Sequence, residues 1–171
     1  MVPVKVFFIG MLIGWIVLPA AVFLYLRFGY VPVAVNGPLI PFEQLLAGAA
    51  VEAKIAREAP AHAGLPPTEE NLLAGAKIYR DQCVECHGLP GSAKTNAAKG
   101  MFPDPPQFFE RVVMGNEPVG QDYWVVANGI RLTGMPGYKG SLSDEQMWQV
   151  SQFLANRGKL PESVAGALAG K

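Results

Sequence analysis

The sequence Cys83-Val84-Glu85-Cys86-His87 contains both cysteines of the 171-residue chain. Two thiols at this spacing lie about one helical turn apart, close enough to bond to the same group. Two cysteines are too few for the disulfide framework of a small secreted protein. The spacing therefore indicates a covalent or metal-binding role.

Three kinds of site use a cysteine pair of this spacing. A thioredoxin-like redox pair needs a βαβ setting, and a zinc site needs two more Cys or His ligands. No strand pattern precedes Cys83, and the other histidine, His62, lies in a segment rich in proline and glycine. Cys-x-x-Cys-His is the attachment signature of c-type haem, whose vinyl groups react with the thiols. The motif predicts one covalent haem c, bonded to Cys83 and Cys86, with His87 as an iron ligand.

The sixth ligand of the iron is expected to be a methionine, because an occupied sixth position suits electron transfer and excludes small molecules. Met114 and Met147 fall in predicted helices, where methionine usually fills the core. Met101 follows His87 too closely for the chain to wrap around a haem. Met135 lies in the Gly- and Pro-bounded loop TGMPGY between two predicted helices, and we expect it to bind the iron.

An uninterrupted apolar run extends from Val6 to Leu26, between Lys5 and Arg27. As a helix it covers about 30 Å, the thickness of the hydrocarbon core of a bilayer. A cleaved signal peptide is the alternative, but its apolar region is usually shorter. We expect residues 1–27 to form a transmembrane anchor.

The rest of the chain divides into three segments. Residues 28–67 are rich in Pro, Gly and Ala, which predicts a linker with one helix at about 42–59. That helix is a spacer or, alternatively, a docking site for a partner. Residues 68–157 form the predicted haem domain, and residues 158–171 are expected to be a flexible tail.

Four helices are predicted in the haem domain, at about 68–83, Gln107–Met114, Asp122–Asn128 and 143–156. Thr68 is expected to cap the first, and Gly129 to end the third. Ser143 and Gln146 form a capping box at the start of the last, whose apolar face carries Met147, Val150, Phe153 and Leu154. No alternating strand pattern of useful length occurs outside the anchor and its exit, so the predicted fold class is all-α.

Residues 68–157 resemble the class I cytochromes c. Gly75 and Tyr79 match the glycine and the aromatic residue of that family's first helix, and Phe153 matches the aromatic residue of its last helix. The stretch NGIRLTGMPGY, from Asn128 to Tyr138, resembles the family's distal loop with its ligand methionine. The resemblance implies a small all-α fold around one haem, with the first and last helices crossing closely.

The resemblance also implies electron exchange through an exposed edge of the haem. Trp124 and Arg131 match residues that contact the haem propionates in relatives, although a core tryptophan and a solvated arginine are the alternatives. An electron carrier is therefore expected rather than an enzyme. The alternative is a haem enzyme or gas sensor with a displaceable sixth ligand.

The expected partners follow from charge and from the anchor. The formal net charge of zero argues against nucleic-acid binding. Residues 6–26 are expected to contact the lipid bilayer, and redox proteins in or on the membrane to exchange electrons with the haem. The chain is a free carrier or a subunit of a respiratory or photosynthetic complex. Because c-type haem is attached outside the cytoplasm, we expect the N-terminus inside a bacterium and the haem domain in the periplasm.

Overall fold

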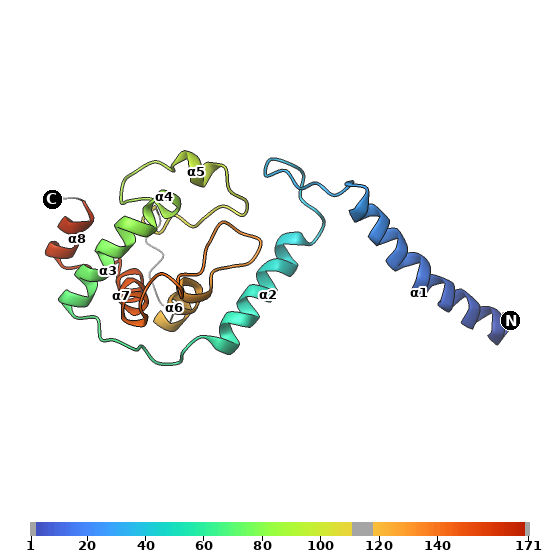
Figure 1. Ribbon diagram of the computed structural model, residues 1–171, viewed down its shortest axis with the longest axis horizontal. Coiled ribbons are helices and arrows are strands. Elements are labelled where there is room, and N and C mark those ends of the chain that lie inside the picture. The colour runs from blue at the N-terminus through green and yellow to red at the C-terminus, as the bar shows by residue number, and fades with distance from the viewer. Residues whose placement is uncertain (1–2, 111–117, 170–171) are drawn as a thin grey trace. The chain divides into compact units, whose positions relative to one another are not determined.

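The computed structural model describes residues 3–110 and 118–169. Within these residues the regular elements are α-helices, as Figure 1 shows, which confirms the predicted all-α class. The chain divides into two compact units, Met1–Gln44 and Leu45–Lys171. The second unit has the small cytochrome c fold expected from the sequence.

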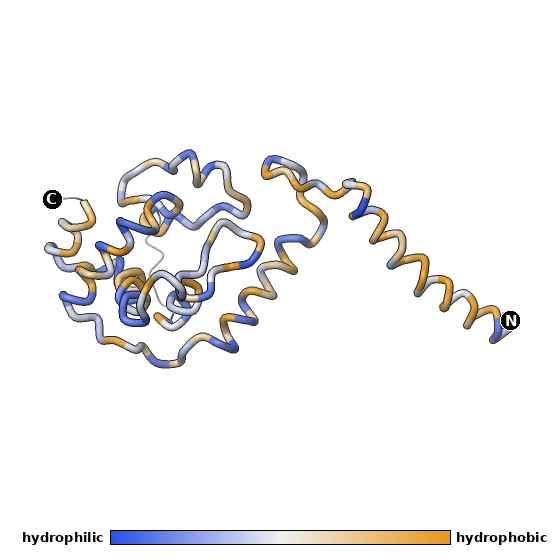
Figure 2. Tube along the Cα trace, in the orientation of Figure 1, coloured by the Kyte–Doolittle hydropathy of each residue, from blue (hydrophilic) through white to orange (hydrophobic). Residues whose placement is uncertain are grey.

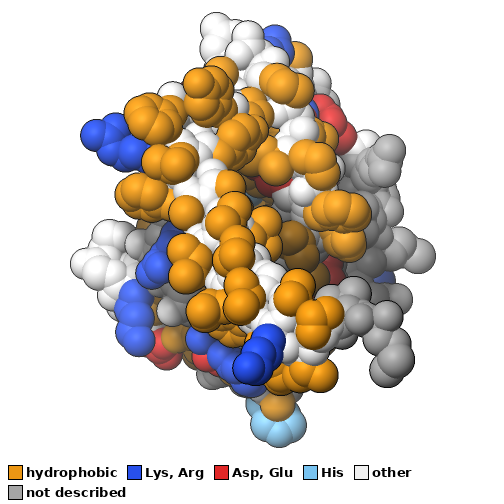
Figure 3. Space-filling view, turned by 90° about the vertical axis from the view of Figure 1, so that its right-hand side faces the viewer, with side chains coloured by type: hydrophobic (Ala, Val, Ile, Leu, Met, Phe, Trp, Pro, Cys, Tyr) orange, Lys and Arg blue, Asp and Glu red, His pale blue; other side chains and the backbone are white. Residues whose placement is uncertain are grey.

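The first unit is dominated by α1 (Val4–Arg27), which includes the predicted apolar run and continues beyond it at both ends. The helix is long and apolar enough to cross a membrane, and none of its residues is buried. Figure 2 shows the hydrophobic colour along almost its whole length, and Figure 3 shows many hydrophobic side chains on the face that it views. The apolar surface of α1 is therefore available to lipid.

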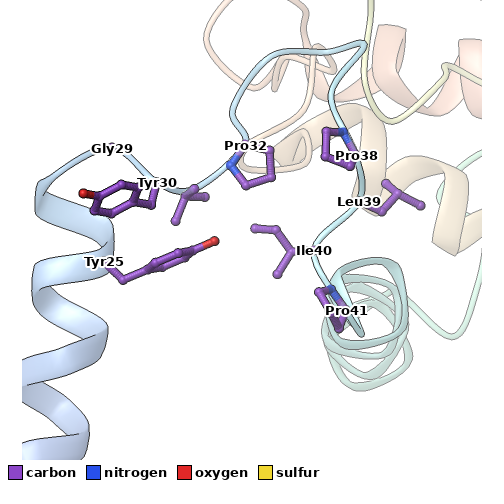
Figure 4. Close-up of a pocket in the computed structure, with 9 residues that line it drawn as sticks. Tyr25, Gly29, Tyr30, Pro32, Pro38, Leu39, Ile40 and Pro41 are labelled. Atoms are coloured by element: carbon purple, nitrogen blue, oxygen red, sulfur yellow. The ribbon is translucent and has the colours of Figure 1, made fainter.

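A pocket of about 470 Å³ lies where the chain leaves α1. The rings of Tyr25 and Tyr30 stack beside it with centroids 6.1 Å apart. Figure 4 shows these two rings together with the side chains of Pro32, Pro38, Leu39, Ile40 and Pro41. No charged residue occurs between Arg27 and Glu43, so the chain continues the apolar character of the helix after the helix has ended.

The second unit is built on the crossing of α3 (Glu69–Gln82) and α7 (Asp144–Ala155). A Cβ atom on Gly75 would lie 2.2 Å from the backbone oxygen of Gln149, so only glycine allows this approach. The rings of Tyr79 and Phe153 are fully buried in the crossing, with centroids 5.3 Å apart. The close crossing implied by Gly75, Tyr79 and Phe153 is confirmed.

The predicted helix ends are confirmed where side chains cap them. Thr68 Oγ1 accepts a hydrogen bond from the Asn71 N–H at 3.3 Å, and Ser143 forms the expected capping box with Gln146. α6 (Val119–Asn128) ends at Gly129, whose φ is +65°, but it begins before the predicted Asp122. A positive φ strains any residue with a Cβ, which explains the glycine at this end.

The predicted helix at Gln107–Met114 is not observed in its described part. Residues 107–110 form a turn, and residues 111–114 lie outside the described residues. Two one-turn helices, α4 (Val84–His87) and α5 (Asn96–Lys99), were not predicted. In the turn at residues 107–110, the side chain of Gln107 donates to the backbone of the cysteine motif.

The prediction of a flexible tail at residues 158–171 is wrong for the central part of this segment. α8 (Glu162–Leu168) packs against α3, with Val164 fully buried and Leu168 nearly so. The Arg80 guanidinium donates to the backbone oxygen of Ala167 at 3.1 Å. Two apolar side chains one helical turn apart are enough to dock this short helix on the core, although the Ala- and Gly-rich sequence around them is typical of a frayed end.

Candidate functional site

A cavity of about 380 Å³ in the second unit is lined by Cys83, Cys86, His87 and Met135. Cys83 follows the last residue of α3, His87 ends α4, and Met135 lies between α6 and α7. Met135, expected to bind the iron, is thus brought to the cysteine motif from a distant part of the sequence. The bonding roles of the four residues stay predictions.

The cysteine motif forms one tight turn of helix. The N–H groups of Cys86 and His87 both donate to the carbonyl of Cys83, at 3.2 and 2.9 Å. Gln107 Nε2 donates to the carbonyl of Cys86 at 2.9 Å. The buried Tyr79 hydroxyl donates to the carbonyl of Gly88 at 2.7 Å. These bonds hold both thiols and the imidazole in one fixed arrangement beside the cavity.

The surroundings of His87 favour its neutral form. Its side chain is buried, its ring stacks on Phe108 with centroids 4.7 Å apart, and its Nδ1 lies 2.9 Å from the carbonyl oxygen of Pro106. A carbonyl can only accept a hydrogen bond, so Nδ1 carries the proton and Nε2 keeps its lone pair. Burial lowers the pKa of His87, which favours the neutral form that can bind a metal.

Cys83 does not have the environment of a reactive redox cysteine. Burial, and secondarily the neighbouring Cys86, raise the pKa of the Cys83 thiol to about 12. The reactive cysteine of a thioredoxin-like pair has a lowered pKa, because the thiolate is the nucleophile. The described residues also contain no group of three or more His, Cys, Asp or Glu side chains that could hold a metal ion. The site therefore resembles neither a redox pair nor a zinc site.

The loop that carries Met135 is folded back on itself. A Cβ atom on Gly129 would lie 2.5 Å from the backbone nitrogen of Gly137, so the two ends of the loop touch through glycine. The Met135 carbonyl accepts from the Ile130 N–H, and the Met135 N–H donates to Thr133 Oγ1, both at 3.1 Å. These two bonds restrain the backbone of Met135, from which the thioether side chain extends.

The same loop is tied to the cysteine motif. The Tyr138 hydroxyl donates to the carbonyl of Gln82 at 3.0 Å, directly before Cys83. The Tyr138 N–H also donates to the carbonyl of Val126 in α6 at 2.9 Å. The two sides of the cavity are thus connected by protein contacts alone.

A second thioether, Met101, also lines the cavity. A Cβ atom on Gly134 would lie only 2.8 Å from Met101 Sδ, so this side chain reaches the loop next to Met135. The sequence argument set Met101 aside because it follows His87 closely, but the intervening loop brings it back to the cavity. Met147 is buried in the core as expected, and Met114 lies outside the described residues.

Trp124 and Arg131 are not among the described residues that line the cavity. Arg131 is exposed, and Trp124 helps to lower the pKa of Glu58 of α2 (Glu43–Glu58), after the larger effect of Lys54. Their contacts with haem propionates stay predictions. His62 is exposed and also lies outside the cavity lining, as its place in the linker led us to expect.

Most of the remaining cavity wall was not predicted. It is largely apolar and is supplied by α6, α7, a proline-rich turn and α2; among its residues are Ile55, Pro103, Pro105, Pro106, Phe108, Val125, Val126, Ile130 and Leu154. The run PDPPQ at 103–107 was the available signal, since clustered prolines fix a loop in one conformation. Two thiols, a neutral imidazole, thioethers and an apolar wall fit a c-type haem.

Comparisons with known proteins agree with this fit. The family model described as cytochrome c oxidase, cbb3-type, subunit III matches residues 70–154. Thiosulfate dehydrogenase of Allochromatium vinosum is 34% identical over 87 residues, which are 50% of this chain and 31% of that protein. The chain thus spans about a third of the length of that relative.

A solved structure, the reducing HAO-like protein complex of Kuenenia stuttgartiensis, is 28% identical and covers 57% of this chain and 49% of its own, with a TM-score of 0.45. The family match extends from the first turn of α3 to the last turn of α7 and includes the cysteine motif and the Met135 loop. The cavity is therefore formed mainly by the matched stretch, and residues 70–154 form a c-type cytochrome domain, which carries covalently bound haem and transfers electrons.

Proposed function

We propose that the chain is a membrane-anchored electron carrier whose single haem is bonded to Cys83 and Cys86 and ligated by His87 and Met135. The main support for this proposal is that the cysteine motif and the Met135 loop line the same cavity. Bound haem supplies an iron that alternates between the ferric and ferrous states. The residues of the chain determine how easily and where this exchange occurs.

Each ligand is held by its surroundings. The Pro106 carbonyl fixes the His87 ring through Nδ1, leaving Nε2 for the iron. The hydrogen bonds of Thr133 and Ile130 restrain the backbone of Met135. Fixed ligands reorganise little when the iron changes charge, and a thioether ligand raises the reduction potential. Such a site favours electron transfer over binding of small molecules.

The sixth ligand is tested by carbon monoxide. The optical spectrum of the reduced, detergent-extracted protein should not change when carbon monoxide is added, because Met135 occupies the iron. Met135→Ala should keep its covalent haem but bind carbon monoxide and have a lower potential. Met101→Leu is the matched control and should behave like the wild type. Loss of the low-spin spectrum in Met101→Leu but not in Met135→Ala would assign the ligand to Met101 and overturn the proposal.

The anchor defines where the carrier works. With α1 in the membrane, we place the N-terminus in the cytoplasm and the haem domain in the periplasm of a bacterium, because c-type haem is attached there. A protease added to intact spheroplasts should release the haem domain. A haem domain that is protected until the membrane is opened would reverse this orientation.

Its partners should be membrane redox proteins, either in succession or within one complex. The matched family is named as a subunit of an oxidase, and the curated relative is an oxidoreductase, so a donor and an acceptor of this kind are expected. Extraction in mild detergent tests complex membership. A haem protein that always migrates alone would favour a free anchored carrier.

A further inference from the structure

The helix α2 has two different faces, although its sequence suggested a spacer. Between Leu45 and Glu58, the half-buried positions are Gly48, Val51 and Ile55, and the other positions are exposed. Spacings of three and four residues place these positions on one side of a helix. A spacer surrounded by water would be exposed on all sides. One face of α2 is therefore covered by the unit that contains the cavity.

The chain after α2 is fixed to the same unit. The backbone oxygen of Pro60 approaches Gly120 so closely that a Cβ atom there would lie 1.9 Å from it. Further on, Gln152 Nε2 of α7 donates to the carbonyl of Leu65. These contacts hold the chain that follows α2, at Pro60 and Leu65, against the unit that contains the cavity.

The covered face of α2 leads to the cavity. Ile55 and Glu52 line it together with His87 and Met135. Figure 1 shows α2 alongside the loop between α6 and α7, the loop that carries Met135. Ile55 is half-buried, whereas Glu52 is exposed. The apolar side chain thus points into the cavity wall, and the carboxylate lies at the rim where the cavity meets solvent.

We infer that α2 forms a wall of the haem crevice, in which Ile55 excludes water from the haem and Glu52 places a negative charge at its rim. The inference rests on the proposed position of the haem in this cavity. Ferric haem carries one more positive charge than ferrous haem. A dry, apolar wall disfavours the extra charge and raises the potential, whereas a nearby carboxylate stabilises it and lowers the potential. Ile55 and Glu52 therefore act in opposite directions.

Glu52 differs from the neighbouring carboxylate Asp104, which also lines the cavity. Asp104 lies 2.8 Å from Lys94 Nζ, so an opposite charge compensates it. Glu52 comes from a segment outside the matched family stretch. Glu52 and Ile55 thus reach the cavity from a segment outside the matched domain.

The test is a redox titration of the full-length, haem-loaded protein in detergent. Ile55→Ser should lower the midpoint potential, because water gains access and stabilises the ferric state. Glu52→Gln should raise the potential, and Glu52→Lys should raise it about twice as far, since the charge change doubles. The shifts at Glu52 should shrink with added salt, because the side chain is exposed. Leu46→Ser on the exposed face of α2 and Glu145→Gln on α7 are the controls and should leave the potential unchanged.

The optical spectrum of each variant separates this inference from the proposed function. Opposite shifts at positions 52 and 55, with an intact low-spin spectrum, support α2 as a crevice wall. An intact spectrum with potentials equal to those of the two controls overturns the inference while leaving the carrier proposal standing. Shifts of the same sign also overturn it, because a general loosening of the domain would produce them. If Ile55→Ser loses the low-spin spectrum, the two Glu52 variants decide the question alone.

Discussion

The two units of this chain differ in how far their apolar side chains are exposed. In Met1–Gln44 they are exposed: α1 has no buried residue, and Val33 beyond it is 89% exposed. In Leu45–Lys171 they form a core in which Tyr79, Val150 and Phe153 have 1% exposure or less. Exposed apolar surface on this scale is unusual in water, so the apolar helix of the first unit fits a membrane anchor.

Composition alone therefore does not show where the core lies. Both units are rich in Leu, Val and Phe, but only the second spaces them so that helices can bury them against each other. In α3 the buried residues recur at helical spacing, at Leu72, Gly75, Ala76 and Tyr79, whereas the apolar residues of α1 surround the helix on all sides. The anchor and the haem domain should therefore be separable.

The largest expected effect is the loss of membrane attachment without loss of the haem domain. A chain that begins at Pro41, exported with a cleavable signal peptide, should move completely from the membrane to the soluble fraction. Its haem spectrum and melting temperature should match those of the parent, because α1 contributes no buried residue. Fractionation and thermal unfolding measure both quantities. A truncated protein that loses its haem would show that the two units depend on each other.

The next largest effect is expected at the helix crossing of the second unit. Gly75→Ala should lower the free energy of unfolding by about 3 kcal/mol, because the added methyl group meets the backbone of α7 and forces the helices apart. Gly166→Ala is the matched control in α8, where nothing lies within 4 Å of a Cβ atom. That change should stabilise the protein by up to about 1 kcal/mol. Equal effects in denaturant unfolding of the two variants would contradict the close crossing.

A smaller effect tests the packed tail. Val164→Ala should cost about 2 kcal/mol, because the side chain is fully buried between α8 and the core. Leu132→Ala removes a larger side chain that is 93% exposed, and it should change the free energy of unfolding little. A Val164 variant as stable as the wild type would restore the expectation of a frayed tail.

The sequence predicted those features whose cause is local. The cysteine motif, the capping box at Ser143 and the glycine after Asn128 each depend on chemistry within a few residues, and each was placed correctly. The crossing at Gly75 was predicted only through the resemblance to a family, because a single glycine in a sequence does not identify the residue that packs against it. Met135 was chosen from its Gly- and Pro-bounded loop between two predicted helices, and the resemblance to a family added support to that choice.

The features that were missed depend on contacts between distant segments. Val164 and Leu168 dock α8 on α3, but in the sequence they stand in an Ala- and Gly-rich stretch. Ile55 is one apolar residue in an Ala-rich helix, so its place in the cavity wall could not be recognised before the fold was known. Met101 returns to the cavity through a loop whose course the sequence leaves open. In each case the partner lies far away along the chain, where no periodicity points to it.

The smallest expected effect concerns a surface contact of the second unit. Tyr123 stacks on Trp148 with ring centroids 4.0 Å apart, and its hydroxyl donates to Asp144. Tyr123→Phe keeps the stacking and loses the hydrogen bond, so it should cost about 1 kcal/mol at neutral pH. Tyr30→Phe in the anchor unit, whose ring is 70% exposed, should leave the unfolding of the haem domain unchanged.

The effect of Tyr123→Phe should depend on pH in one direction. The hydrogen bond to Asp144 raises the pKa of Tyr123 to about 12, whereas the pKa in the unfolded chain is about 10. The folded state therefore holds the phenol proton more tightly, and its contribution to stability is complete below pH ~10 and disappears as the pH rises through about 12. Urea unfolding of wild type and variant at a series of pH values should show their stabilities converging in that window. A difference that stays constant to high pH would mean that the hydroxyl contributes through packing and that the bond to Asp144 does not stabilise this edge of α7.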